Sequence, residues 1–239
     1  MTTEMEKIRT FLDSMSYKEK RCTCLDMKEG RDPFITISRQ TGAGGHTLAL
    51  DILDEITKQK RDPIFEGWKM FDEELCKRVV EDPELKVSMN ALLGEEYRSQ
   101  MEDLLDEILI GLTPQEVIVK KIFDILRTLA TFGRSILVGR GGACLTRDLP
   151  LGIHVRLVAS PSSRIQRMMK LMNLSEAKAR ELVAKQDTAR AQLVKTYFHK
   201  DINDPLLYDV IWNTDTVPLP EIARSVVNLV KAKSCHSLV

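Results

Sequence analysis

The sequence predicts an α/β fold in which a parallel β-sheet is covered by helices on both faces. Short apolar runs rich in β-branched residues alternate with longer segments in which apolar residues recur at helical spacing. The first apolar run leads into a glycine-rich turn and then into a helical segment. The chain of 239 residues is long enough to bury one sizeable hydrophobic core.

Residues 1–32 are predicted to form an N-terminal helical extension and linker that precede the core. The segment is polar and charged, has Ile8, Phe11 and Leu12 at helical spacing, and ends in Glu-Gly-Arg-Asp-Pro. The domain itself is expected to span residues 33–235. An interaction protein that works through the extension is one function that the sequence leaves open.

The first element of the domain is expected to be a strand over Phe34–Ser38, bounded by Pro33. The glycine turn Gly42-Ala43-Gly44-Gly45 follows it. A helix should come next, because its apolar residues recur at helical spacing. These residues are Leu48, Ile52, Leu53 and Ile56.

The middle of the chain is predicted to be helical. A capping box with proline at the first helical position, Thr113-Pro114-Gln115-Glu116, opens one helix. An earlier apolar stripe consists of Met101, Leu104, Leu105, Ile108 and Leu109. The apolar positions after the capping box are Ile118, Ile122, Ile125, Leu126 and Leu129.

Three further strands and three further helices are expected after residue 135. The strands are Ile136–Val138, Ile153–Val158 and Val210–Trp212. The helices begin at Ser160-Pro161, at Ser175 and at Pro220. The strand that ends at Val138 runs directly into Gly139-Arg140-Gly141-Gly142.

The distribution of charge suggests a local anion site. Lys plus Arg equals Asp plus Glu at 35 each, so the total charge predicts no nucleic-acid partner. Residues 156–200 carry ten Lys/Arg against three Asp/Glu, whereas residues 72–107 carry twelve Asp/Glu against four Lys/Arg. Solvated helical faces remain the alternative explanation of both stretches.

The cysteines and the apolar runs favour a cytoplasmic protein. Five cysteines without framework spacing argue against a disulfide scaffold, and Cys22-Thr23-Cys24 has no second ligand pair at zinc spacing. No apolar run approaches the length that a membrane span requires, and the N-terminus has no secretory h-region. We therefore expect no membrane partner.

The turn between the first strand and helix has the character of an anion cradle. Backbone amides at a helix start point outward, and the helix dipole favours negative charge there. The stretch from Gly42 to Thr47 is not a Walker A sequence, which reads G-x-x-x-x-G-K-[ST], because Gly45 stands at the lysine position. From the glycines alone, a simple tight turn is the competing interpretation.

Several motifs resemble the cytidylate kinase-like family, and the similarity covers about residues 34–232. They are Ile35–Ala49, Phe71-Asp72-Glu73-Glu74-Leu75, Val138-Gly139-Arg140-Gly141, Asp187-Thr188-Ala189-Arg190, Asp204-Pro205 and Asn213-Thr214. The resemblance implies a P-loop nucleoside-monophosphate-kinase-like fold of three α/β/α layers. It also implies a helical insert at about 82–132 and a basic lid at about 160–204.

The resemblance implies that the chain moves the γ-phosphate of ATP to a nucleoside monophosphate, with CMP or dCMP as the first candidate acceptor. ATP and Mg²⁺ are the expected cofactors, and a small-molecule acceptor is the expected partner. The formation of a homo-oligomer is left open. Such chemistry needs positioned cations and donors more than covalent help from the protein.

The resemblance also assigns roles to individual residues. Gly42, Ala43, Gly44 and Gly45 would hold the donor phosphates, with Arg39 and His46 beside them, and Thr47 would place its hydroxyl on Mg²⁺. Asp72, Arg78 and Arg167 would bind the acceptor, and Arg140, Arg164, Asp187 and Arg190 would act on the transferred phosphoryl group. The structural alternatives are a helix cap for Thr47, a solvated helix start for His46, a surface arginine for Arg78 and an ordinary ion pair for Asp187 with Arg190.

The chain departs from cytidylate kinases at three positions. Gly45 removes the loop lysine, for which Arg39 or a lid arginine is the expected replacement. Gly141 stands where the parent enzymes have aspartate, and Glu73 where they have a small hydroxyl residue. Two alternatives follow: a nucleotide-binding regulatory module without transfer activity, and a kinase of another small molecule.

Overall fold

The computed structural model describes residues 32–59, 62–72, 114–139 and 141–236. The predicted N-terminal extension, the apolar stripe near residue 105 and most of the predicted helical insert lie outside these residues. So do Glu73, Arg78 and Arg140. The site predictions for Arg78 and Arg140 therefore stay predictions.

The core is a five-stranded sheet in the order β2-β3-β1-β4-β5, and every neighbouring pair is parallel. In the register, Ile37 of β1 pairs with Val138 of β3 on one side and with Val155 of β4 on the other. The strands are β1 Phe34–Arg39, β2 Lys69–Phe71, β3 Ser135–Val138, β4 Gly152–Val158 and β5 Val210–Asn213. The predicted parallel sheet is confirmed, and all four predicted strands are present.

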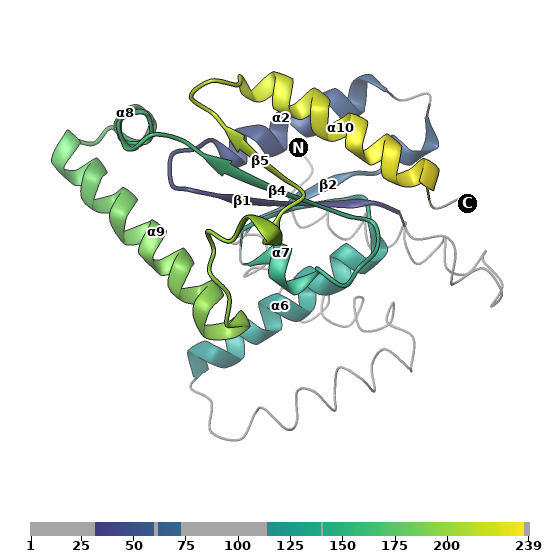
Figure 1. Cartoon of the computed structure of the whole chain (residues 1–239), viewed down its shortest axis with the longest axis horizontal. Coiled ribbons are helices and arrows are strands. Elements are labelled where there is room, and N and C mark those ends of the chain that lie inside the picture. Colours follow the sequence, from purple (N-terminus) through teal and green to yellow (C-terminus); the bar gives the residue numbers. More distant parts are fainter. Residues whose placement is uncertain (1–31, 60–61, 73–113, 140, 237–239) are drawn as a thin grey trace, which may run out of the picture.

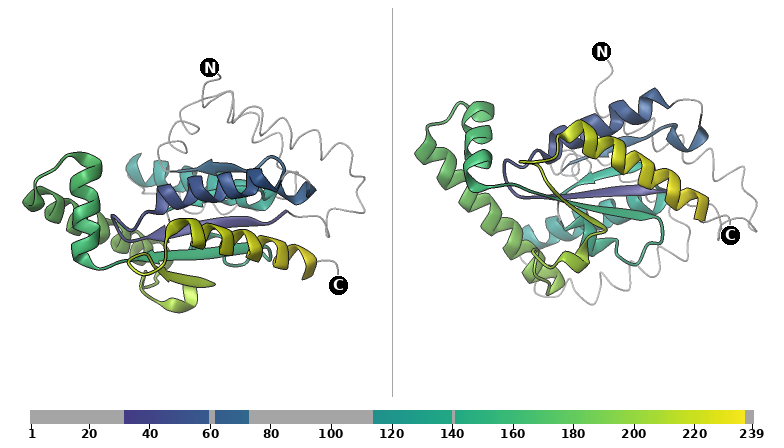
Figure 2. Two further views of the ribbon diagram at one scale, coloured as in Figure 1. Left: turned by 90° about the horizontal axis from the view of Figure 1, so that it is seen from above. Right: turned by 45° about the horizontal axis from the view of Figure 1, so that its top comes forward.

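Helices cover both faces of the sheet, which makes three layers (Figures 1 and 2). Helices α2 (Gly45–Lys58) and α10 (Leu219–His236) lie together on one face, and α6 (Pro114–Phe132) and α7 (Gly142–Leu145) lie on the other. The main apolar cluster joins the strands to α2 and α10. The fold is thus the predicted three-layer α/β fold.

Helices α8 (Pro161–Met172) and α9 (Glu176–Phe198) stand beyond the carboxyl ends of the strands, at the left of Figure 1. They pack on each other through a small apolar cluster that includes Ile165 and Val183. Ser160 caps α8, because its hydroxyl accepts a hydrogen bond from the backbone N of Ser163. We call the α8–α9 pair the lid.

Two short 3-10 helices complete the described structure, Pro63–Phe65 and Pro205–Leu207. Each follows an aspartate whose side chain accepts a backbone hydrogen bond two residues on, as Asp62 and Asp204 do here. Within the described residues, none of the helices has the length and apolar character needed to cross a bilayer.

Candidate phosphate-binding site

Residues 41–44 form the turn between β1 and α2, at the carboxyl edge of the sheet. Gly44 is the N-cap of α2. Because glycine has no side chain, no side chain caps the helix start, and the first turn carries no acidic residue. The first amides of the helix and its dipole are therefore directed at whatever lies in front of the turn. Since Gly44 is the cap, the helix-cap interpretation of Thr47 is wrong; Thr47 lies exposed in the first turn.

Gly42 is required where the turn meets the lid. Its φ of 80° lies in the left-handed region, and an added Cβ would lie 2.5 Å from the backbone oxygen of Arg164 on α8. The absence of a side chain at this position lets the backbone of the lid approach the backbone of the turn.

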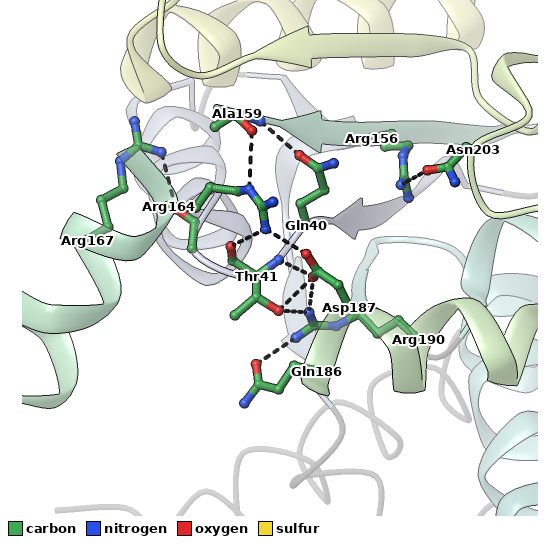
Figure 3. Close-up of polar contacts among 11 residues, drawn as sticks. Gln40, Thr41, Arg156, Ala159, Arg164, Arg167, Gln186, Asp187, Arg190 and Asn203 are labelled. Carbon is green, nitrogen blue, oxygen red and sulfur yellow. Dashed lines mark hydrogen bonds and ion pairs between the residues drawn. The ribbon is translucent and has the colours of Figure 1, made fainter. Parts of the chain in front are cut away.

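Asp187 of α9 joins the lid to the turn (Figure 3). Its Oδ1 accepts hydrogen bonds from the backbone N of Thr41 at 2.7 Å and from the Thr41 hydroxyl at 2.8 Å. Its Oδ2 accepts from the guanidinium of Arg164 at 2.6 Å. One carboxylate thus fixes a loop residue and a lid arginine at the same time.

Two lid arginines surround the same carboxylate. Arg164 is buried and also donates to the backbone oxygens of Thr41 and Ala159, each at 3.2 Å. Arg190 lies 3.3 Å from Asp187 and donates to the Thr41 hydroxyl. Burial lowers the pKa of the Arg190 guanidinium, and the charge of Asp187 acts in the opposite direction.

The predicted ion pair between Asp187 and Arg190 is therefore present, but it belongs to a larger network. Both side chains contact Thr41, a residue about 150 positions earlier in the sequence. An isolated surface pair on one helix would make no such contact with the loop. This network brings the predicted lid residues to the predicted phosphate loop.

Arg167 ties the lid to the segment after β5. Its guanidinium donates to the backbone oxygen of Gly42 at 3.3 Å and to the hydroxyl and carbonyl oxygens of Thr214, both at 2.8 Å. On the other side of the turn, the Gln40 side chain accepts from the backbone N of Ala159 at 3.0 Å. The turn is held from α8 and from both neighbouring loops.

Arg39, the last residue of β1, lies against the start of α2. A Cβ added to Gly45 would lie 2.9 Å from Cγ and 3.1 Å from Cδ of Arg39. A Cβ added to Gly139, at the end of β3, would lie 3.0 Å from Cζ of Arg39. The arginine side chain thus runs past one glycine toward the other.

His46 and Asp72 approach each other on the opposite side of the turn. Nδ1 of His46 lies 3.9 Å from Oδ2 of Asp72, and the histidine side chain is largely exposed. This matches the solvated helix-start interpretation of His46. It also places Asp72, which follows β2, beside the predicted phosphate loop.

A cavity of about 300 Å³ lies at the carboxyl ends of β1 and β3, under α9. Arg39 and Arg190 both line it, together with the Ser38 and Tyr208 side chains. Arg156 donates to the Ser38 hydroxyl at 3.0 Å and to the Tyr208 hydroxyl at 3.3 Å. The cavity is therefore small, partly polar and flanked by cations.

Gly141 lines this cavity, and the Phe198 ring packs against Gly141. Gly141 has a φ of 68°, and a Cβ added to it would lie 2.6 Å from Cε2 of Phe198. The Phe198 ring also lies 5.2 Å from that of Phe123, and Tyr197 packs edge-on against Phe123 at 5.3 Å. Tyr197 and Phe198 thus both pack against Phe123.

Sequence reasoning missed three residues of this region, Thr41, Arg156 and Tyr208. An arginine inside the otherwise apolar run Ile153–Val158 is a signal that could have identified Arg156, which is buried. Thr41 gave no signal of its own, because its role depends on contact with a distant helix. Arg180, in contrast, is exposed and pairs only with Glu176 of its own helix among the contacts of the described residues.

Residues 34–216 match the sequence profile of the cytidylate kinase-like family, so the chain belongs to this family. A cytidylate kinase from Sulfurisphaera tokodaii is 28% identical over 116 residues, which cover 47% of this chain and 64% of that protein. A uronate isomerase from Corynebacterium glutamicum is 28% identical over 104 residues, or 44% of this chain and 20% of that protein. The chain thus spans less than two thirds of either relative.

Solved structures share the fold. An uncharacterized protein from Eubacterium ventriosum superposes with a TM-score of 0.59 at 16% identity, covering 84% of this chain and 99% of that one. A shikimate kinase from Bacteroides thetaiotaomicron superposes with a TM-score of 0.48 at 13% identity, covering 83% and 98%. The chain thus belongs to the cytidylate kinase-like family and shares its fold with a solved protein.

Proposed function

We propose that the protein is an ATP- and Mg²⁺-dependent phosphotransferase with a nucleoside monophosphate, CMP or dCMP first, as the acceptor. The observation that carries the proposal is the network in which Asp187, Arg164 and Arg190 of the lid contact Thr41 of the glycine turn. It gathers cations around a helix start without a capping side chain. Such a site suits a polyphosphate.

In the proposed reaction, the bond between the γ-phosphorus and its bridging oxygen breaks, and the electron pair stays on ADP. An oxygen of the acceptor phosphate forms the new bond and is already deprotonated, so the protein need not supply a base. The task of the protein is to hold and neutralise the phosphates in line. Mg²⁺ would supply further positive charge between the phosphate oxygens.

Different residues of this chain would hold the donor phosphates, neutralise the transferred group and position the other side chains. The backbone of residues 42–47 would hold the donor phosphates, with the Thr47 hydroxyl directed to Mg²⁺. Arg164, Arg190 and the predicted site residue Arg140 would neutralise the transferred group. Asp187 would position Thr41 and the two lid arginines, since it contacts all three.

Asp72 and the predicted residue Arg78 would bind the acceptor phosphate. Arg167 shares this assignment, and its contacts with Gly42 and Thr214 also fit a role in positioning the turn. His46 would lie at the entrance, next to Asp72. The cytoplasm is the compartment in which we expect this activity.

A kinase of a different small molecule is the second candidate, and one observation favours it. Where cytidylate kinases carry an aspartate, this chain has Gly141, and the ring of Phe198 fills the space in front of it. The space next to residue 141 is therefore filled by an apolar ring, where the parent enzymes present a carboxylate. An acceptor other than cytidine monophosphate would be compatible with that change.

The proposal is tested by ADP formation from ATP and Mg²⁺ with a panel of nucleoside monophosphates, nucleosides, sugars and hydroxy acids. The expected result is ADP that depends on the acceptor and on the metal, with CMP or dCMP phosphorylated. Formation of another phosphorylated product would select the second candidate. If ATP binds tightly and no acceptor yields ADP, the phosphotransferase proposal is wrong and a regulatory module is supported.

A further inference from the structure

Two positions that flank the turn, the last residue of β1 and the first residue of α2, carry residues that are exchanged relative to the P-loop pattern. In G-x-x-x-x-G-K-[ST], the second glycine corresponds to Gly44, so the lysine falls on residue 45 and the first glycine on residue 39. This chain has Gly45 at the lysine position and Arg39 at the glycine position. A cation is thus lost at one of these positions and gained at the other.

The structure shows that the two positions share one space. The three atoms nearest to a Cβ added to Gly45 are Cγ, Cδ and Cβ of Arg39, at 2.9, 3.1 and 3.3 Å. A contact below 3.0 Å is closer than real Cβ atoms allow. The stem of Arg39 therefore fills the volume into which a side chain of residue 45 would extend.

Gly139 makes room for the other end of the same side chain. It has a φ of 93°, and a Cβ added there would meet the guanidinium of Arg39, with Cζ at 3.0 Å. The guanidinium consequently lies between the start of α2 and the end of β3. It also lines the cavity that contains the Arg190 side chain.

The lid arginines contact oxygen atoms of the turn, and Figure 3 shows Arg164 and Arg190 at Thr41. Arg164 donates to the carbonyl oxygen of Thr41, and Arg167 donates to that of Gly42. Arg190 donates to the Thr41 hydroxyl. These arginines donate to oxygen atoms of Thr41 and Gly42, whereas the stem of Arg39 lies against Gly45, the first residue of α2.

We propose that Arg39 replaces the missing loop lysine and binds the phosphoryl group that is transferred. The proposal deepens the proposed function and rests on it. In the P-loop pattern, the lysine reaches the β- and γ-phosphates from the helix start. Here the guanidinium of Arg39 would bind these phosphates from the end of β1. Its planar fork can bind two phosphate oxygens.

The exchange is tested by measuring nucleotide affinity and turnover of full-length variants. Arg39→Met keeps an apolar stem beside Gly45 and removes the charge. It should bind a non-hydrolysable ATP analogue at least about tenfold more weakly, while its affinity for ADP changes less than about threefold, because the lost contact is with the terminal phosphate. Turnover with the best acceptor should fall about 100-fold or more.

The reciprocal variants give the sharper result. Gly45→Lys alone should bind the analogue more weakly than the wild type, because its stem meets that of Arg39. The double variant Arg39→Gly/Gly45→Lys should recover at least about tenfold in affinity over Arg39→Gly, because it restores the first glycine and the lysine of the pattern. Arg180→Met is the control: this exposed lid arginine pairs with Glu176, and its loss should change neither quantity.

Each outcome separates this inference from the proposed function. If the wild type binds neither nucleotide, the proposed function is wrong, and the inference is overturned with it. If the wild type binds both but Arg39→Met retains its preference for the analogue over ADP, the inference alone is overturned. Thermal melting verifies the fold, and Arg39→Gln replaces Arg39→Met if the latter is unfolded.

Discussion

Among single residues, Asp187 has the contacts that best explain how the lid and the turn are joined. Its two oxygens accept four hydrogen bonds from Thr41, Arg164 and Arg190. The side chains of Asp187 and Arg164 are 28% and 9% exposed, so this ion pair is shielded from solvent more than a surface pair is. Removing one partner would leave the buried guanidinium without its charged acceptor.

Asp187→Asn tests this role. The free energy of unfolding should fall by about 1–3 kcal/mol, because the neutral amide accepts a weaker hydrogen bond from Arg164. Urea denaturation at neutral pH measures the change. The matched control is Glu176→Gln, whose pair with Arg180 is exposed and should contribute less than about 0.5 kcal/mol. Equal effects of the two substitutions would contradict the role given to Asp187.

The sequence predicted this site in part. The spacing of three residues between Asp187 and Arg190 predicts an ion pair on one helix, and that pair is present. The spacing of Asp187 and Arg190 contains no information about Thr41, because their contacts with Thr41 depend on how the lid packs against the turn. Likewise, the sequence shows that glycine replaces the loop lysine at residue 45. Only the structure shows that the side chain of Arg39 fills the space next to Gly45.

At the scale of elements, the position of α8 against the turn depends on Gly42. A Cβ at this residue would meet the backbone of Arg164, which cannot move without moving the helix. A flexible side chain in the same place could rotate away. The close approach of turn and lid is therefore a backbone-to-backbone contact.

Gly42→Ala and Gly67→Ala form a matched pair that isolates this contact. Gly67 has a similar φ of 75° and open space around it, against 80° and a 2.5 Å contact at Gly42. Both variants should lose about 1 kcal/mol from the left-handed backbone. Gly42→Ala should lose more, about 1–3 kcal/mol in total, and should speed amide exchange in α8. Indistinguishable denaturation and exchange would refute the contact.

The elements themselves were largely predictable. Short apolar runs and helix-start signals such as Ser160-Pro161 identify four strands and the main helices around them, since both depend on local sequence. Strand β2 was missed because Lys69–Phe71 is three residues long, too short to show a period of two. It forms because Met70 and Phe71 pair with β3, a long-range contact.

At the scale of the whole molecule, one buried histidine makes stability depend on pH. His154 lies in β4, between β1 and β5, and its Nδ1 is 2.9 Å from the Thr36 hydroxyl. Burial lowers its pKa from 6.5 to about 4, although Asp209 acts to raise it. The folded protein thus keeps this histidine neutral over a range in which the unfolded chain protonates it.

Stability should therefore fall as the pH decreases from 6.5 toward 4, by up to about 1.4 kcal/mol per pH unit from this residue. Asp124, whose pKa burial raises from 3.8 to about 6, contributes with the opposite sign in an overlapping range. The contribution of Asp124 is the same in the wild type and in His154→Gln, so it cancels when the two proteins are compared. The difference in unfolding free energy should shrink toward pH 4; a constant difference would show that His154 has the same pKa in the folded and unfolded states.

The central claim is that the turn and the first residues of α2, from Thr41 to Thr47, bind a polyphosphate. Isothermal titration calorimetry of the wild-type protein with ATP, ADP, AMP and adenosine, in the presence of Mg²⁺, tests it most directly. The account predicts that ADP binds at least about tenfold more tightly than AMP and adenosine, because amides and guanidinium groups bind the β-phosphate. Equal affinities for ADP and adenosine, or no binding of ATP or ADP, would contradict it.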